Sequence, residues 1–410
     1  MQLPIPRGRI SHSLFEDICW LVRSTFEKID DPQKITRFQS AFAGYVGRKH
    51  CVVFPFARTG IYSVLKNLEL PEGSVVIMPP ITIKPILDVV LDLKLIPVFV
   101  DIDPSTVCFS EVGLSEALKS KPRVAILTYL FGIVPNAEKI CDSLKSANVY
   151  VIEDFSQCLN GRFRHRKIGT FGDASVYSAS SVKTLDTYGG GFVFTDDHEM
   201  ARKLSDDQSR LSKPSRLRLL KKIRTDLVRN FASQPAIFAI LTFPILRFID
   251  KRGSSKLTKF TGDRDQKPIS SLPSEWFESY SSIQAKVGLQ QIKQMEKKDL
   301  NRIRAINKLN NSHKFMDRPL GVDGGGNVYW QYIIYASEYK KLHRHLTSRG
   351  IDCATTSLVK ISGLESYRFQ GHTPNADRLY TNGVYLPCYH QLKDSQLSRI
   401  AKALSEIESS

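Results

Sequence analysis

Short apolar runs alternate with longer amphipathic stretches between residues 51 and 195. Stretches such as 84–94 and 136–146 carry apolar residues at helical spacing, whereas the short continuous runs predict buried strands. The predicted strands lie at residues 51–54, 74–82, 96–109, 124–128, 150–152, 174–178 and 192–194. Strands that alternate with helices through short loops predict an α/β fold with a mostly parallel sheet covered by helices.

The chain is organised differently on either side of this pattern. Residues 12–50 predict two amphipathic helices, and Pro32 suits the first position of the second one. One extended amphipathic helix is predicted over residues 281–311. A smaller α+β domain follows, with predicted strands at 327–336, 351–355 and 383–387 and helices at 337–349 and 394–408.

These patterns divide the chain into four predicted parts. Residues 1–212 form a large domain with its N-terminal helices, and residues 213–262 form an insertion. A connecting helix region at 263–315 leads into a small C-terminal domain at 316–410.

The insertion joins a basic, leucine-rich run at 213–230 to an apolar run at 231–249. Pro235 and Pro244 interrupt the apolar run, so it is poorly suited to cross a membrane. We expect residues 213–252 to lie on a membrane surface, where their cations would face anionic headgroups. The alternative is a helical subdomain that packs its apolar face on the protein body or on a dimer mate.

Composition excludes several classes of function. A net charge of +17 suggests a nucleic-acid partner. Much of this charge falls after residue 212, and no nucleic-acid motif accompanies it, so we predict that the protein does not bind nucleic acid. Seven scattered cysteines and an N-terminus without an apolar h-region favour a reducing cytoplasm, with the inner membrane face as the surface for peripheral contact. His343 and His345 would face different sides of a helix, and we predict no metal.

Polar residues follow the ends of two predicted strands. Asp154 ends the strand that begins at Tyr150, and Ser178 and Lys183 follow the strand at 174–178. Ligands bind beyond the carboxyl ends of strands in open α/β sheets. An amine that condenses with an aldehyde, a carboxylate for a pyridine nitrogen and hydroxyl donors for a phosphate together predict pyridoxal 5'-phosphate (PLP). The ordinary alternatives are an exposed loop lysine and a surface acid.

The spacing of this stretch resembles the core motif of the DegT/DnrJ/StrS sugar aminotransferases, which are PLP enzymes of fold type I. The resemblance implies a seven-stranded type of sheet in the large domain. The matching residues are Glu153, Asp154, Gln157, Gly161, Gly169, Gly172, Asp173, Tyr177, Ser178, Lys183, Gly190 and Gly191.

The resemblance also implies roles for individual residues. Lys183 would bind PLP covalently and carry protons, and Asp154 would keep the pyridine nitrogen protonated. Gln157 would lie near the ring oxygen of the cofactor, and Ser178 would bind its phosphate.

The phosphate site would be completed by a strand-to-helix turn at Arg58, Thr59 and Gly60, where backbone amides suit an anion. This turn matches the family in a variant form. A plain turn between a strand and a helix is the alternative interpretation.

The sequence departs from the family at three positions. Ile83 stands where relatives stack an aromatic ring on PLP, so the ring would be packed by an aliphatic side chain or by an aromatic such as Tyr129. Gly189 replaces a glutamate of many relatives, and Phe277 falls near a partner-subunit asparagine that meets the phosphate.

The family implies a cytoplasmic homodimer with composite active sites that transfers an amino group from an amino acid, with L-glutamate expected, to a keto sugar. The sugar is expected to be nucleotide-linked, and its product to serve surface polysaccharide or amino-sugar synthesis. Because of the three departures, a second hypothesis is a PLP-binding member without transaminase turnover that acts as a scaffold or regulator at a membrane.

Overall fold

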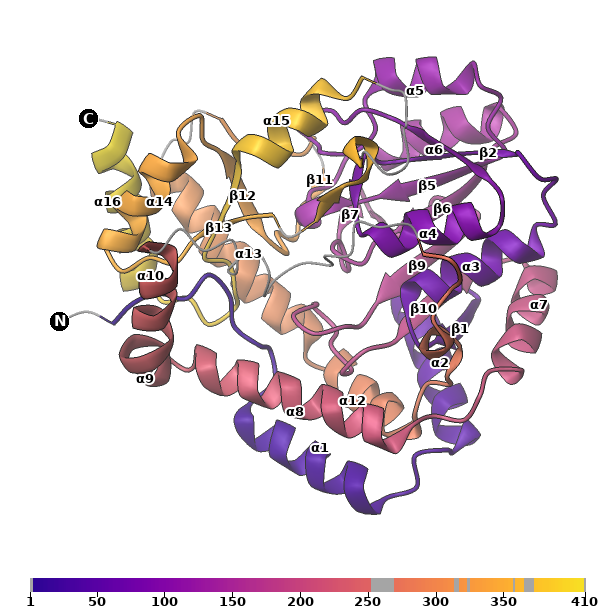
Figure 1. The fold of residues 1–410 in the computed structure, drawn as a ribbon, viewed down its shortest axis with the longest axis horizontal. Helices are drawn as coiled ribbons and strands as arrows, with labels where there is room; N and C mark the ends of the chain where they lie inside the picture. Colours follow the sequence, from indigo (N-terminus) through magenta and orange to yellow (C-terminus); the bar gives the residue numbers. More distant parts are fainter. Residues whose placement is uncertain are drawn as a thin grey trace.

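The larger part of the molecule is built on a seven-stranded sheet in the order β1-β10-β9-β6-β5-β2-β4 (Figure 1). The computed structural model describes residues 3–251, 269–312, 317–322, 325–356, 358–364 and 372–408. The strands are β1 (His50–Phe54), β2 (Val75–Met78), β4 (Ile96–Phe99), β5 (Val124–Thr128), β6 (Tyr150–Asp154), β9 (Ala174–Ser178) and β10 (Gly191–Thr195). β10 runs antiparallel to both of its neighbours, β1 and β9, and the other strand pairs of this sheet are parallel. The predicted fold class is confirmed.

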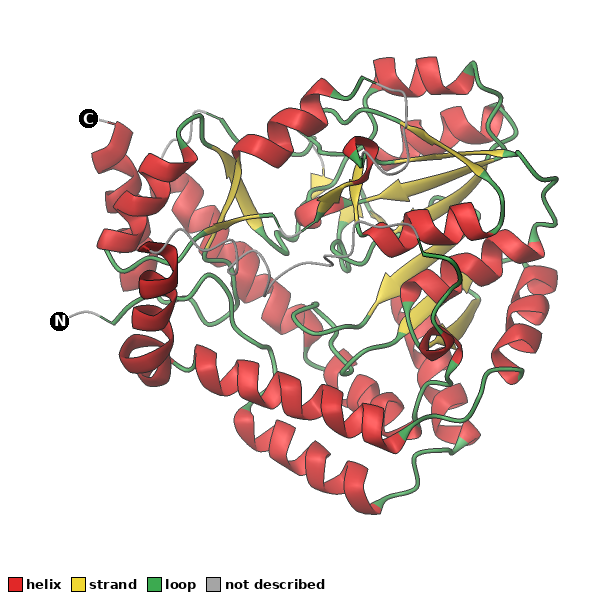
Figure 2. Ribbon diagram, in the orientation of Figure 1, coloured by secondary structure: helices red, strands yellow, loops and turns green. Residues whose placement is uncertain are grey.

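Helices cover both faces of this sheet (Figure 2). Val53 and Leu127 pack in one core, and the adjacent Val52 and Ile126 pack in another on the opposite face, as the two-residue period of a strand requires. The first core includes residues of α2 (Pro32–Val46), α5 (Glu111–Leu118) and α6 (Ala137–Ser146). The second includes residues of α3 (Ala57–Asn67), α4 (Lys84–Asp92) and α7 (His198–Ser209).

A smaller unit holds most of the C-terminal part of the chain. Its sheet has β15 between β12 and β13, and all three strands pair antiparallel. Its elements are β12 (Tyr332–Tyr335), α14 (Tyr339–Ser348), β13 (Ala354–Thr355), α15 (Pro374–Asn382), β15 (Gly383–Leu386) and α16 (Asp394–Glu408). The predicted domain boundaries stay a prediction.

Residues from the start of the chain complete this smaller unit. The Ile5 N–H donates to the Gly350 carbonyl (2.8 Å), and the Asp352 N–H donates to the Ile5 carbonyl (3.0 Å). The Arg7 side chain forms an ion pair with Asp352 (2.7 Å). Ile5 is fully buried in the same core as α14 and α16.

The predicted helix at 281–311 is two helices, α12 (Ser282–Ile292) and α13 (Met295–Ser312). The break has a packing reason, because the two helices serve different cores. Gly288 of α12 lies against the Phe38 ring of α2, whereas Ala305 and Ile306 of α13 belong to the core of the smaller unit. This packing matches a connection between two domains of one subunit.

The insertion begins with α8 (Arg216–Ser233), which lies beside α1 (Leu14–Phe26) (Figure 1). The short helix α9 (Pro235–Ile237), a π-helical turn at 238–242 and α10 (Phe243–Lys251) follow. None of the helices described is by itself long and apolar enough to span a bilayer, although 216–233 and 235–249 satisfy length and composition together, with a bend of 68° between them. The rest of the predicted insertion, 252–262, lies outside the described residues.

Candidate active site

Two adjacent acids at the end of β6 have different surroundings. The fully buried Glu153 carboxylate accepts hydrogen bonds from the Tyr129 hydroxyl (2.6 Å) and from the N–H groups of Gly169 (3.0 Å) and Gly172 (2.6 Å). Asp154 accepts a hydrogen bond from the Ser156 N–H (3.0 Å). The Glu153 carboxylate therefore holds the loop at 169–172 through hydrogen bonds. Asp154 is the carboxylate that can take part in the chemistry of the site.

Charge and burial act in opposite directions on Asp154. Burial raises the pKa of its carboxyl group, while hydrogen bonding to Ser156 and the charge of Lys183 lower the pKa. A positively charged partner at this carboxylate would therefore favour its ionised form.

Lys183 lies in the loop that joins β9 to β10. Its Nζ is 3.9 Å from the centroid of the Trp330 ring, and the Trp330 indole N–H donates to the Val182 carbonyl (2.9 Å). Burial lowers the pKa of Lys183 to about 8, and the Asp154 charge opposes this change. Burial therefore makes the neutral, nucleophilic form of this amine easier to reach than in an exposed lysine.

The loop that carries Lys183 contains a strained residue. Val182 has φ of 67°, a value that a β-branched side chain rarely adopts. Such strain is typical of functional sites, where surrounding structure holds the residue in place.

The start of α3 lies against the end of β9. Gly191 pairs with Ser178, and a Cβ on Gly191 would lie 2.1 Å from the Ala57 nitrogen, so β10 needs glycine where it passes the helix. The Ser178 hydroxyl donates to the Ser180 hydroxyl (3.2 Å), and the Ser178 N–H donates to the Ser156 hydroxyl (2.9 Å). The Ser178 and Ser180 hydroxyls and the N-terminus of α3 thus lie in the same part of the molecule.

The predicted turn at Arg58, Thr59 and Gly60 is the first turn of α3, since the helix is capped by Phe56. The Thr59 hydroxyl donates to the Trp276 carbonyl (2.8 Å). A Cβ on Gly60 would lie 2.5 Å from Val193, so this glycine permits close packing of α3 on β10. The Arg58 guanidinium lies over the Phe56 and Trp276 rings, 4.0 and 4.3 Å from their centroids.

Gln157 is buried close to Asp154 in the turn that follows β6. Its Oε1 accepts a hydrogen bond from the Phe131 N–H (2.7 Å). Phe131 has φ of 58°, so the Gln157 amide helps to hold an unusual backbone conformation.

The three departures from the family have distinct places. Ile83 caps α4 and is half-buried, whereas Tyr129 is fully buried in the core with its hydroxyl on Glu153. The Phe277 ring packs edge-on against the Tyr62 ring of α3, with 5.6 Å between centroids. Gly189 has φ of +110° and contacts a lysine of the insertion, Lys222.

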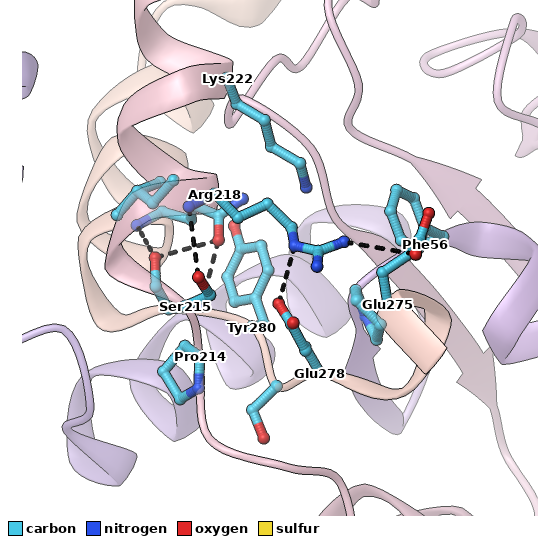
Figure 3. A pocket seen from close by; sticks show the side chains of 13 residues that line it. Phe56, Pro214, Ser215, Arg218, Lys222, Glu275, Glu278 and Tyr280 are labelled. Carbon is cyan, nitrogen blue, oxygen red and sulfur yellow. Dashed lines mark hydrogen bonds and ion pairs between the residues drawn. The ribbon is translucent and has the colours of Figure 1, made fainter. Parts of the chain in front are cut away.

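Lys222 and Trp330 were not among the sequence-predicted site residues. Lys222 extends from α8 towards Phe56, and its Nζ is 4.8 Å from the centroid of that ring (Figure 3). It lines a cavity of about 20 Å³, which holds about one water molecule and is far too small for a sugar. Trp330 contacts Lys183 although the two residues are far apart in sequence. The sequence shows at this position an aromatic residue just before a predicted strand, which does not indicate a site residue.

A model of the DegT/DnrJ/EryC1/StrS aminotransferase family matches residues 16–216 and 280–405. The chain belongs to this family. Membership confirms the expected family and, with it, PLP as the family's cofactor. The two matched blocks leave out residues 217–279, so Lys222 lies outside the sequence that the family shares.

Curated relatives in the family match part of the chain. The spore coat polysaccharide biosynthesis protein SpsC of Bacillus subtilis is 29% identical over 171 residues, 42% of this chain and 44% of that protein. The L-glutamine:scyllo-inosose aminotransferase of Streptomyces griseus is 28% identical over 202 residues, 48% of this chain and 47% of that protein. The matches span about half the length of these relatives.

A solved structure extends the similarity of fold to the whole chain. Helicobacter pylori PseC, an aminotransferase involved in the biosynthesis of pseudoaminic acid, has a TM-score of 0.74 at 19% identity. The alignment covers 99% of this chain and all of the PseC chain.

Proposed function

We propose that this chain is a PLP-dependent aminotransferase that transfers an amino group from an amino acid to a keto sugar. The observation that carries the proposal is the position of Lys183, which follows β9, beside Asp154 at the end of the parallel neighbour β6. The charge of each of these two residues affects the pKa of the other. Family membership supports the same activity.

The donor set of the site fits PLP. When bound, PLP supplies an aldehyde for an amine and a ring that withdraws electrons from the adjacent carbon. Lys183 would be the amine that holds the aldehyde, and its Nζ would hold or move a proton when it is not bonded to the cofactor. Asp154 would hold the pyridine N–H, and Gln157 would contact the ring edge from the turn after β6.

The phosphate of PLP is assigned to the other end of the site. Ser178 and the first turn of α3, with Arg58, Thr59 and Gly60, form this end. The Thr59 hydroxyl donates to the Trp276 carbonyl, and the N–H groups of Thr59 and Gly60 donate to the Phe56 carbonyl (3.1 and 3.2 Å). A phosphate that binds the N–H groups of these two residues would therefore replace the Phe56 carbonyl as their acceptor.

The substrates are proposed from relatives. We expected L-glutamate as amino donor, and the Streptomyces griseus relative is named for L-glutamine, so both belong in the first assay. A GDP-perosamine synthase of Caulobacter vibrioides, 28% identical over 170 residues, favours a nucleotide-linked keto sugar for polysaccharide or amino-sugar synthesis.

A homodimer, a cytoplasmic location and peripheral contact with the inner membrane face through residues 213–252 complete the proposal. Four apolar side chains on the outer face of α1 support an interface with a second copy. They are Phe15, Ile18, Val22 and Phe26.

A two-part experiment tests the function. Borohydride reduction of the PLP-loaded protein, followed by peptide mapping, is expected to label Lys183. Lys84 forms a buried ion pair with Asp88 (2.7 Å) and should stay unlabelled. Label on Lys84, Lys167 or Lys222 would overturn the assignment.

The second part measures turnover with each amino donor. The absorbance of the PLP-loaded protein is expected to shift to that of the pyridoxamine form when L-glutamate or L-glutamine is added. A screen of keto sugars against that form then identifies the acceptor. Label on Lys183 without conversion by any amino donor would favour the hypothesis of a membrane-associated scaffold or regulator.

A further inference from the structure

The inward face of α8 contains a lysine among residues that pack on the protein body. Leu219, Ile223, Asp226 and Asn230 are buried at helical spacing, and Lys222 lies on the same side of the helix. Lys221 is exposed on the opposite side. In α8, Lys222 and Arg218 therefore face the cavity beside Phe56, and Lys221 faces solvent.

Side-chain hydrogen bonds fix this orientation of α8. Asp226 accepts a hydrogen bond from Ser181, two residues before Lys183. Asn230 donates to the Asp17 carboxylate of α1 (2.7 Å) and to the His12 carbonyl (2.8 Å). The position of Lys222 is thus coupled to the loop that carries Lys183.

Lys222 reaches the end of the site where β9 and α3 meet. Its Nζ lies 2.7 Å from the position that a Cβ on Gly189 would take, so glycine leaves the space that the ammonium group occupies. The ring centroid of Phe56, the residue that caps α3, lies 4.8 Å from this Nζ. Gly191, two residues after Gly189, contacts the first turn of α3 and pairs with Ser178.

The charges around Lys222 favour an anion. Burial and the positive charges of Arg218 and Arg58 together lower its pKa to about 8, against the opposing effect of Glu278 and Asp226. Arg218 forms an ion pair with Glu278 (3.0 Å), and Asp226 forms one with Arg229 (3.4 Å). Across the described parts of the chain no carboxylate forms an ion pair with Lys222.

From this geometry we propose that Lys222 binds the phosphate group of PLP from within the same chain, together with Ser178 and the start of α3. The inference rests on the proposed function, because it takes PLP as the ligand of the site. A phosphate dianion would supply the charge-assisted hydrogen bonds that a half-buried ammonium group needs. The position of Lys222 outside the family's matched blocks makes this contact a property of the insertion.

The test compares PLP with pyridoxal, which lacks the phosphate. Apo-protein is titrated with each ligand, and dissociation constants are measured for wild type, Lys222→Met, Lys222→Arg and the control Lys221→Met. PLP affinity is expected to fall about tenfold or more in Lys222→Met, as for the loss of one charge-assisted hydrogen bond. Lys222→Arg should recover most of it, and pyridoxal should bind all four proteins equally.

Three results would overturn the inference: unchanged PLP affinity in Lys222→Met, equal losses for PLP and pyridoxal, or the same loss in Lys221→Met. Equal thermal unfolding of the apo-proteins shows that the variants fold. Failure of the proposed function is distinguishable. If PLP is not the ligand, wild type carries no borohydride label at Lys183, and if turnover fails, Lys183 is labelled but no amino donor converts the protein to the pyridoxamine form.

Discussion

Individual residues of the PLP motif have two kinds of task. Glu153 and Asp173 bind backbone N–H groups, the latter that of Val151 (2.7 Å), and so hold the loops around β6. Asp154 and Lys183 influence each other's pKa. Sequence spacing located all four residues but could not separate these tasks, because the separation depends on which way each side chain points at the end of a strand.

Replacing Glu153 by Gln should reduce stability. Its carboxylate accepts three hydrogen bonds, and an amide NH₂ in its place would face at least one N–H donor, so the free energy of unfolding should fall by about 2 kcal/mol or more. Urea unfolding measures this loss. The control is Glu138→Gln, whose exposed ion pair with Arg164 (3.0 Å) should contribute under about 1 kcal/mol. Equal losses in the two variants would show that Glu153 is not a special anchor.

Among the elements, each strand of the large sheet was predicted near its observed place, although the strand predicted at 96–109 ends at Phe99 in β4. The packing of the insertion was predicted less accurately. The ends of the strands could be located from the apolar runs in the sequence. These ends place Asp154 and Ser178 correctly at the carboxyl ends of two neighbouring strands, β6 and β9. The inward face of α8 carries Asp226 and Asn230, so its apolar periodicity is masked and the packed side could not be identified. Lys222 and Trp330 reach the site through contacts between distant segments, which no local pattern encodes.

A buried polar cluster joins several of these elements. His12 Nδ1 lies 3.1 Å from an Asp17 carboxylate oxygen of α1 and 2.8 Å from the Tyr188 hydroxyl. His12 Nε2 lies 2.9 Å from the Asp186 carbonyl, in the loop of Lys183. Burial alone would lower the pKa of His12, but the carboxylates of Asp186 and Asp17 outweigh it and raise the pKa above 6.5.

The cluster predicts a pH-dependent stability. Because the folded protein holds the His12 proton more tightly, this stabilisation is fully present below pH 6.5 and is lost as the pH rises through the folded pKa. The contribution of His12 to the urea midpoint should therefore fall as the pH rises above 6.5. His12→Gln should remove this part of the slope, and His165→Gln, at an exposed position, should leave it. An unchanged slope in His12→Gln would contradict the prediction.

At the scale of the whole molecule, α8 and the segment after it present cations and apolar side chains to solvent. Lys221 and Arg224 lie on the outward face of α8 beside Leu217 and Val228, which are 81% and 65% exposed. Between residues 235 and 249 the exposed large apolar side chains are those of Ile240, Leu241, Ile245 and Phe248. Burial of the inner face leaves this outer face available for the proposed membrane contact.

Vesicle flotation tests that contact. The protein should float with anionic vesicles at low salt and detach at high salt, since each cation near such a surface contributes about 1 kcal/mol. Ile240→Asp should weaken flotation, and Val112→Asp, at an equally exposed site on α5, should not. Absence of flotation at low salt would leave a packed subdomain as the better account of residues 213–251.

The pairing of Ile5 with residues 350 and 352 has a consequence for how the protein is made. A ribosome delivers the chain from its N-terminus, and domains generally fold as they emerge. The large sheet is complete once β10 has left the ribosome, whereas residues 3–7 must wait until almost the whole chain has been synthesised. During that interval Ile5, which is fully buried in the finished protein, is exposed. Closure of the smaller unit is therefore the last event of synthesis, and nascent chains stalled before residue 350 should have a folded sheet and a protease-sensitive N-terminal segment.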